Sequence, residues 1–314
     1  RGERTATKRQ VFDFITYYGL DEKEAFSLWL SDKILKEYKN EAYVLDAFKV
    51  AEERVKYKTV SARVPNSLQE MLQEADLLKQ QWEAKKPLDK TQMRKMKEFF
   101  NVNYTYDSNR IEGSTLTMQE THLVVNEGLT VSGKSMQEHL EAVNHHEAID
   151  FIAGLVKRKE AITERVLNEI HYLILNGIDR KNAGKYRTVP VFISGSSHKP
   201  PQPFLVAKQM EEIFGNYAMS KATTHPILLA ADMHEKVVTV HPYVDGNGRT
   251  SRLLMNLILL ANGYTIANIK GDRASRLSYY RALEDAQTNG VKEAFYRLVI
   301  QTAIDSLKAH IEMT

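Results

Sequence analysis

A glycine-rich turn directly before an apolar run sets the strongest limit on how this chain can fold. Residues 241–252 are HPYVDGNGRTSR, and residues 253–260 are LLMNLILL. The apolar run predicts a buried helix, and the glycines before it leave the backbone free to adopt a positive φ. The turn would therefore present unpaired N–H groups at a helix N-terminus, where the helix dipole favours anions.

The side chains of this turn fit a polyphosphate ligand. Arg249 and Arg252 are three residues apart, so we expect both on the first helical turn, facing the same way. His241 at one edge can act as a base. Asp245 can be a metal ligand, because a lone carboxylate together with phosphates suits a hard cation such as Mg²⁺. The sequence thus predicts a polyphosphate site with a base beside it.

Composition excludes several other kinds of site. The chain has 314 residues and no cysteine, which excludes disulfides, thiolate metal sites and a cysteine nucleophile. The net charge of +3 is too small to indicate a nucleic-acid or membrane surface, so we expect neither as a partner. The apolar run at residues 257–261 falls far short of the ~20 residues of a membrane helix. Residues 1–4 lack a signal-like apolar region, so we expect a cytoplasmic protein.

Residues 241–252 resemble the signature of the Fic (filamentation induced by cAMP) family, HPFx[D/E]GNGRxxR. Every functional position matches. The one departure is Tyr243 in place of the usual Phe, which keeps an aromatic ring at an expected packing position. The family resemblance is the basis for the expectations about activity and site residues that follow.

An upstream segment resembles the inhibitory motif of one class of this family. Residues 108–113 are SNRIEG, which fits the pattern [S/T]xxxE[G/N]. In that class a helix N-terminal to the core lies against the nucleotide pocket, and its Glu pairs with the second Arg of the signature. The resemblance implies an inhibitory role for Ser108, Glu112 and Gly113, with Glu112 paired to Arg252. The alternative is that Glu112 is a solvated residue near a helix end.

Residues 183–195, AGKYRTVPVFISG, differ in character from the helical sequence around them. Their β-branched and aromatic residues with flanking glycines predict a short strand or hairpin, the only sheet we expect. The segment resembles the flap of the family, a hairpin that holds the target protein by main-chain pairing. We therefore expect target docking at Val189, Pro190, Val191 and Phe192. A plain surface hairpin is the alternative.

The rest of the chain predicts helices. The expected fold is all-α, a Fic-type helical bundle with a small β-hairpin flap and an N-terminal helical extension. Capping patterns predict helix starts at Ser67, Asp89, Thr117 and Thr163. The expected regions are an N-terminal helical accessory region at 1–65, a helical region ending in the inhibitory helix at 66–114, the Fic core at 115–265 and C-terminal helices completing the core at 266–314.

Several histidines and tyrosines lie outside the signature. His145 and His146 are adjacent on a predicted helix and point to different faces, so they are interpreted, with His139, as core or surface residues and not as zinc ligands. His234 is interpreted as a packing residue. Tyr279, Tyr280 and Gln287 resemble the place where family members hold the adenine ring, although core tyrosines would look the same in sequence.

The resemblance implies a protein adenylyltransferase (AMPylator) that moves AMP from ATP to a Ser, Thr or Tyr hydroxyl of a target protein. His241 would be the general base and Asp245 the ligand of Mg²⁺. The expected nucleotide- and phosphate-binding residues are Gly246, Asn247, Gly248, Arg249 and Arg252. Gly248 favours nucleotidyl transfer, since a branch of the family with Lys at this position is associated with phosphorylation.

Three questions stay open at this point. The same residues fit removal of AMP from a modified protein, with Glu112 directing water, or a nucleotide-sensing adaptor without turnover. Nucleotide binding without turnover in a Glu112→Gly protein would favour the adaptor. The donor could supply UMP or another group instead of AMP. The target protein is unknown and could be the chain itself, and a homodimer is possible.

Overall fold

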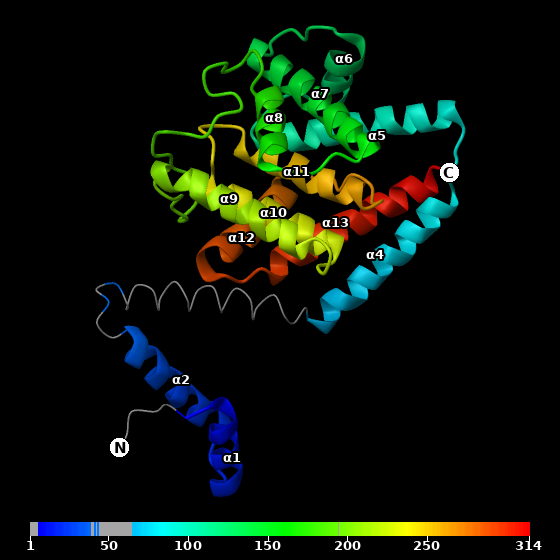
Figure 1. Ribbon diagram of the computed structural model, residues 1–314. Coiled ribbons are helices and arrows are strands. Elements are labelled where there is room, and N and C mark those ends of the chain that lie inside the picture. The colour runs from blue at the N-terminus through cyan, green and yellow to red at the C-terminus, as the bar shows by residue number, and fades with distance from the viewer. Residues whose placement is uncertain (1–5, 39–40, 42, 44–64, 194) are drawn as a thin grey trace. The chain divides into compact units, whose positions relative to one another are not determined.

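The structure is a computed structural model that describes residues 6–38, 41, 43, 65–193 and 195–314 (Figure 1). The chain divides into two compact units, Arg1–Pro65 and Asn66–Thr314. The helices are α1 (Lys8–Tyr18), α2 (Glu22–Tyr38), α4 (Asn66–Ala84), α5 (Lys90–Ile111), α6 (Met118–Glu127), α7 (Met136–Arg158), α8 (Glu164–Ile174), α9 (Pro203–Ser220), α10 (Pro226–Val240), α11 (Asn247–Ala261), α12 (Arg273–Asn289) and α13 (Glu293–Glu312). The described residues contain no β-strand, which confirms the all-α prediction.

The first unit contains α1 and α2. Thr7 and Gln10 form a capping box at the start of α1, and Gly19 ends that helix in the left-handed region, at φ 61°. The indole N–H of Trp29 donates a hydrogen bond of 2.7 Å to the carbonyl of Ala6. The helical structure expected in residues 1–65 is therefore confirmed over α1 and α2. The remainder of that prediction lies outside the described residues.

Helix α11 lies at the centre of the second unit. Its apolar run cannot face water without a large loss of hydrophobic free energy, so it is buried on nearly every side. It packs against α10, α7, α8 and α5, and Figure 1 shows it between the α7–α8 pair and α10. Leu253 and Leu257 join the core cluster formed by α7 and α8. This burial fixes the position of the glycine-rich turn that precedes α11.

Most predicted helix starts are confirmed. Asp89 accepts hydrogen bonds from two backbone N–H groups at the start of α5. Thr117 caps α6 with a full capping box, and Thr163 caps α8. The prediction at Ser67 is wrong, because α4 already begins at Asn66. The Ser67 hydroxyl instead accepts a hydrogen bond from the Arg297 guanidinium of α13, at 2.9 Å.

The predicted β-hairpin flap is also wrong. No described residue between α8 and α9 is in a strand, because a strand needs a paired neighbour and this segment is held in another way. The backbone N–H of Arg187 donates to the carbonyl of Pro242 at 2.9 Å. Its guanidinium donates to the carbonyls of His241 and Pro201, both at 2.7 Å. One buried arginine thus fixes the base of this segment to the end of α10.

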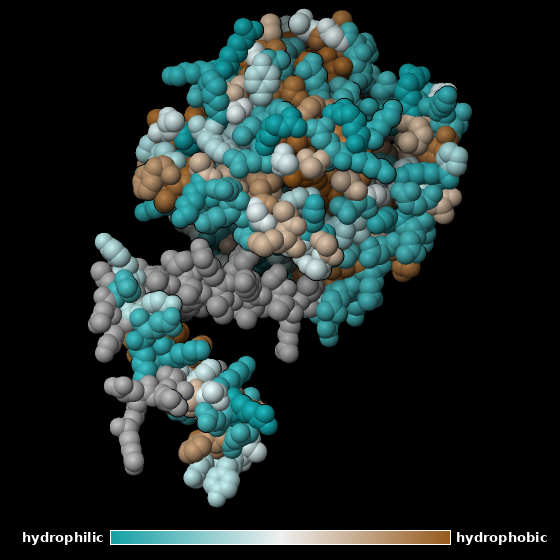
Figure 2. Space-filling view, viewed as in Figure 1, coloured by the Kyte–Doolittle hydropathy of each residue, from teal (hydrophilic) through white to brown (hydrophobic). Residues whose placement is uncertain are grey.

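No helix in the described parts of the chain is both long and apolar enough to cross a membrane. The face of the second unit seen in Figure 2 is largely hydrophilic, with hydrophobic residues in small scattered patches.

Candidate active site

The loop between α10 and α11 has an unusual backbone at both ends. His241 ends α10 in the left-handed region, at φ 51° and ψ 59°, and its N–H donates to the carbonyl of Val237. Gly246 precedes α11 at φ 74°. A positive φ is uncommon for a residue with a side chain, and such strain is found at functional sites. The two turns bring His241 and the N-terminus of α11 together.

Tyr243 anchors the loop to helix α8. It is fully buried, its ring stacks on His171 at 3.6 Å between centroids, and its hydroxyl donates to the Asn168 carboxamide at 2.7 Å. This confirms Tyr243 as a packing residue.

His171 fixes the other side of the loop through its tautomer. The N–H of Gly184 donates to its Nδ1 at 2.9 Å, so Nε2 carries the hydrogen and donates to the carbonyl of Asp245 at 3.0 Å. Burial lowers the pKa of His171 to about 4, which keeps the ring neutral near pH 7. The ring must be neutral for this arrangement, because a protonated imidazole has no acceptor for the N–H of Gly184.

Asn247 closes the loop on itself. Its carboxamide oxygen accepts from the N–H of Tyr243, and its amide group donates to the carbonyl of the same residue, both at 2.9 Å. The side chain therefore shapes the turn, and one of the two N–H donors of its amide group is already engaged. The backbone N–H groups of the first turn of α11 have no acceptor within the helix, so an anion can bind there.

His241 is oriented as a base. Its Nδ1 lies 3.2 Å from the carbonyl of Val238; a carbonyl can only accept, so Nδ1 carries the hydrogen and Nε2 is left as the acceptor. Burial lowers the pKa of His241, and Arg187 and His198 lower it further, while the Val238 carbonyl and Glu112 raise it. The net shift is downward, so the ring is neutral near pH 7 and can take a proton at Nε2.

Arg249 lies between two carboxylates. Its Nη1 is 3.1 Å from Glu141 of α7, and its Nη2 is 3.4 Å from Asp245. The arginine side chain is only 3% exposed, whereas that of Asp245 is 62% exposed. Asp245 can therefore turn towards a ligand, while Arg249 is held inside the protein.

Arg252 is held by the C-terminal end of α5. Its Nη2 is 2.7 Å from the Glu112 carboxylate and 2.9 Å from the carbonyl of Ser108, and its Nε donates to the Ser108 hydroxyl at 3.1 Å. The arginine side chain is 1% exposed. Burial alone would lower the pKa of Arg252, but Glu112, Tyr279 and Tyr104 together outweigh it, and the net shift is upward.

Glu112 also covers the start of α11. A Cβ atom added at Gly248 would overlap the Glu112 carboxylate and would lie 3.0 Å from Nη1 of Arg252. A side chain at this position would therefore displace the Glu112 carboxylate. Gly113 follows at φ 105°, which turns the chain away immediately after the carboxylate.

The residues predicted for the adenine side lie on α12. Tyr279 is 1% exposed, and its hydroxyl lies 2.9 Å from His234 Nε2, so in this structure it packs in the core with His234. Tyr280 is 43% exposed, and its hydroxyl donates to the carbonyl of Ile111 at 2.9 Å, next to Glu112. Gln287 is half-buried. A role of these residues in adenine binding stays a prediction.

The predicted docking residues lie in the irregular segment after α8. The side chains of Val189 and Phe192 are 50% and 90% exposed. The Ser197 N–H and hydroxyl both donate to Glu284 of α12, which ties the far part of this segment to the bundle. Exposed apolar side chains on a segment anchored at both ends are available to another chain, and target docking here stays a prediction.

Sequence reasoning missed Glu141 and His171. Glu141 is an ordinary helical glutamate in sequence, and only the packing of α7 against α11 brings it to Arg249. His171 follows an unremarkable helical pattern in α8. Neither residue stands in a motif, so no sequence signal could have found them.

Asp245 is the residue of this loop that is suited to a metal ion. Among the described residues, no group of three or more His, Asp or Glu side chains could hold an ion. Mg²⁺ is commonly bound by one or two carboxylates together with substrate phosphates and water. The single exposed carboxylate of Asp245 beside a helix N-terminus fits a Mg²⁺ that accompanies a polyphosphate.

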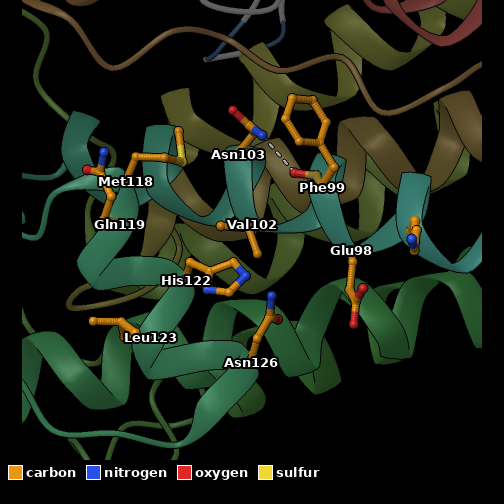
Figure 3. Close-up of a pocket in the computed structure, with 10 residues that line it drawn as sticks. Glu98, Phe99, Val102, Asn103, Met118, Gln119, His122, Leu123 and Asn126 are labelled. Carbon is orange, nitrogen blue, oxygen red and sulfur yellow. Dashed lines mark hydrogen bonds between the residues drawn. The ribbon is translucent and has the colours of Figure 1, made fainter. Parts of the chain in front are cut away.

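A separate hollow lies between α5 and α6. This pocket has a volume of about 730 Å³ and mixed polar and apolar walls. Figure 3 shows Phe99, Val102 and Asn103 of α5 on one side and Met118, His122 and Asn126 of α6 on the other. All of its lining residues belong to these two helices, so it is distinct from the loop before α11.

Comparison with known proteins places this site in a family. Residues 161–259 match the Fic/DOC family. A protein of Nematostella vectensis named protein adenylyltransferase Fic is 37% identical over 224 residues, which are 70% of this chain and 51% of that protein. The chain thus spans about half the length of the curated relatives that it matches.

Solved structures agree with this match. The structure of Fic-1 from C. elegans is similar over 87% of this chain and 78% of that one, with a TM-score of 0.70 and 27% identity. A Fic domain containing signaling protein from Bacteroides thetaiotaomicron is similar over 76% of this chain and 97% of that one, with a TM-score of 0.69 and 25% identity. Residues 161–259 therefore form a Fic domain of the Fic/DOC family.

Proposed function

We propose that this protein is a protein adenylyltransferase that is inhibited by its own helix α5. The observation that carries the proposal is the 2.7 Å ion pair between Glu112 and Arg252, which lies near the N-terminus of α11. The loop before α11 begins at His241, whose Nε2 is left as an acceptor. Relatives named protein adenylyltransferase Fic, at 33–37% identity, support the same reaction.

ATP binds with its phosphates at the start of α11. The backbone N–H groups of Gly246, Asn247 and Gly248 hold phosphate oxygens, because they are donors at the positive end of the helix dipole. Arg249 contacts the β-phosphate and Arg252 the γ-phosphate. Mg²⁺ held by Asp245 would neutralise part of the phosphate charge. These contacts align the α-phosphorus for attack, and alignment with charge neutralisation provides most of the rate of such reactions.

The hydroxyl of a target Ser, Thr or Tyr attacks the α-phosphorus. Its proton passes to Nε2 of His241, a bond forms between the target oxygen and the α-phosphorus, and the bond to the β-phosphate oxygen breaks. Pyrophosphate leaves, and the target carries AMP. The residues around Val189 and Phe192 would hold the target, because they are exposed apolar residues on a segment that Arg187 and Ser197 tie to the rest of the unit.

Inhibition follows from competition for one guanidinium. While Glu112 occupies Arg252, the γ-phosphate lacks its partner and the carboxylate blocks the space above Gly248. A triphosphate replaces the lost carboxylate as a partner for Arg252. Removal of Glu112 should therefore activate the protein without unfolding it.

The test is self-labelling with α-³²P-ATP. We expect the Glu112→Gly protein to incorporate far more label than the wild type, because Arg252 is released and Gly248 is uncovered. His241→Ala should reduce labelling to near background in either form, since base catalysis contributes about 10²–10⁴-fold. Equal labelling of wild type and Glu112→Gly would show that the proposed inhibition is wrong.

A matched control removes a different glutamate from a helix end. Glu127 is the last residue of α6 and its side chain is 49% exposed. Glu127→Gly makes the same chemical change away from Arg252, so its labelling should equal that of the wild type. If Glu127→Gly also activated the protein, loss of a glutamate as such, and not release of Arg252, would be the cause.

A second candidate function is removal of AMP from a modified protein. The Glu112 carboxylate is close enough to influence His241 as well as Arg252, a position from which it could direct water to the phosphorus. In that case the wild type, and not Glu112→Gly, would release AMP from an AMPylated substrate. Incubation of both proteins with such a substrate separates the two functions.

A further inference from the structure

The carboxylate of Glu141 lies beside Arg249 in the interior of the bundle. The two side chains are 3.1 Å apart, with the arginine 3% and the glutamate 14% exposed. Gln137, one turn earlier on α7, donates to the same carboxylate at 3.1 Å. A carboxylate with two partners, on a rigid helix of 23 residues, is held in one place.

The same residue also contacts the inhibitory helix. The main-chain carbonyl of Glu141 accepts a hydrogen bond from the Asn109 amide of α5, at 3.3 Å. Asn109 is one residue after Ser108, which holds Arg252. Position 141 thus lies where α7 meets both α5 and the arginines of α11.

The two carboxylates near Arg249 engage different arms of its guanidinium. Glu141 is at ion-pair distance from Nη1, inside the bundle, without a hydrogen bond to it, and Asp245 accepts a hydrogen bond from Nη2 on the exposed loop. If Asp245 turned towards a cation carried by the phosphates, Nη2 would be free for a phosphate oxygen, while Glu141 would stay beside Nη1. A buried guanidinium that lost both carboxylates would carry uncompensated charge. Glu112 differs from Glu141 in its position, because its carboxylate lies over Gly248 and 34% of its side chain is exposed.

From this geometry we propose that Glu141 is a positioning residue for nucleotide binding. It holds Arg249 with one arm directed to the β-phosphate and keeps the buried charge balanced while Asp245 engages the cation. This inference rests on the proposed function, since it assumes that a nucleoside polyphosphate binds at the start of α11. It predicts that Glu141 matters for ligands with a β-phosphate and not for AMP.

The experiment compares nucleotide binding in proteins that lack the inhibitory carboxylate. Affinities of ATP, ADP and AMP are measured by calorimetry for Glu112→Gly and for Glu112→Gly with Glu141→Gln. We expect the second change to weaken ATP and ADP by about ten-fold, equivalent to about 1.4 kcal/mol, and to leave AMP unchanged. A merely structural role would weaken all three ligands alike.

Two further variants keep the test decisive. Glu147→Gln makes the same charge change at an exposed position of α7 and should leave all three affinities unchanged. Glu141→Asp keeps the charge with a shorter reach, so it should give a smaller loss that is again confined to ATP and ADP. This variant provides the same test if Glu141→Gln does not fold.

The possible failures are distinguishable. If Glu112→Gly bound ATP, and the double variant with Glu141→Gln bound ATP and ADP at least as tightly as Glu112→Gly does, the positioning role would be wrong while the proposed function stood. An equal loss for AMP would also overturn the positioning role. If Glu112→Gly bound no nucleotide at all, the proposed function would be wrong, and this inference with it.

Discussion

The tautomer of His241 decides the chemistry of the site at the scale of single residues. Because Nδ1 donates to the carbonyl of Val238, the unshared pair of Nε2 is available to a substrate proton. Burial keeps the ring neutral, and the guanidinium of Arg187 adds to the same effect. The left-handed backbone of His241 is the conformation that turns the chain out of α10 and into the loop.

The first prediction concerns the pH dependence of that residue. The pKa of His241 lies below its usual 6.5, and Glu112 is one of the groups that raise it. In Glu112→Gly the pKa should therefore be lower still, so the base form persists to more acidic pH. We expect the acid limb of kcat/KM for self-labelling, which reports the free enzyme, to have its midpoint below pH 6.5. A midpoint above pH 6.5 would count against His241 as the base.

At the scale of elements, the position of α5 depends on a buried carboxylate. Asp107 is 5% exposed and accepts from the N–H of Gly271 at 2.9 Å and from the Asn268 amide at 2.7 Å. These bonds hold the segment between α11 and α12 against the inhibitory helix. A Cβ atom at Gly271 would lie 2.7 Å from the carbonyl of Asp107, so the two backbones touch.

We predict that Asp107→Ala destabilises the protein strongly. It leaves the buried N–H of Gly271 and the Asn268 amide without their acceptor, which should cost about 3 kcal/mol of unfolding free energy. Asp150→Ala is the control, because Asp150 forms an exposed pair with Lys97 and such pairs contribute less than about 1 kcal/mol. Urea denaturation measures both, and a similar small loss for the two variants would contradict the role given to Asp107.

Helix starts and the phosphate-binding loop could be predicted because local chemistry determines them. The hydroxyls of Thr117 and Thr163 accept hydrogen bonds from N–H groups three residues later. Gly246 has a positive φ, which is a local requirement of the loop that the sequence shows. The absence of the hairpin could not be predicted, because strand propensity is a local property of the sequence whereas strand pairing needs a neighbouring strand. Three of the carbonyls that Arg187 reaches, those of Pro201, Val240 and His241, come from more distant parts of the sequence. The Glu141–Arg249 contact has the same origin in packing.

At the scale of the whole molecule, several histidines are buried in the neutral form. Burial lowers the pKa of His234 to about 3 and those of His171 and His310 to about 4. It also lowers the pKa of His145 to well below its usual value. All four belong to the unit Asn66–Thr314. In the unfolded chain these rings titrate near pH 6.5.

We therefore predict that this unit loses stability in mild acid. Between about pH 6.5 and pH 4 the unfolded state binds protons that the folded state does not, so the unfolding free energy decreases as the pH falls. Each such proton contributes about 1.4 kcal/mol per pH unit. Denaturation midpoints at pH 8, 6.5 and 5 test this, and equal midpoints at pH 6.5 and pH 5 would show that these histidines are not buried neutral.

The central claim is that the α-phosphorus of ATP is attacked beside His241 once Arg252 is released. Parallel labelling of Glu112→Gly with α-³²P-ATP and γ-³²P-ATP tests it most directly. The account predicts label in the protein from α-³²P-ATP only, with labelled pyrophosphate released from γ-³²P-ATP. Transfer of label from γ-³²P-ATP, or from neither nucleotide, would contradict it.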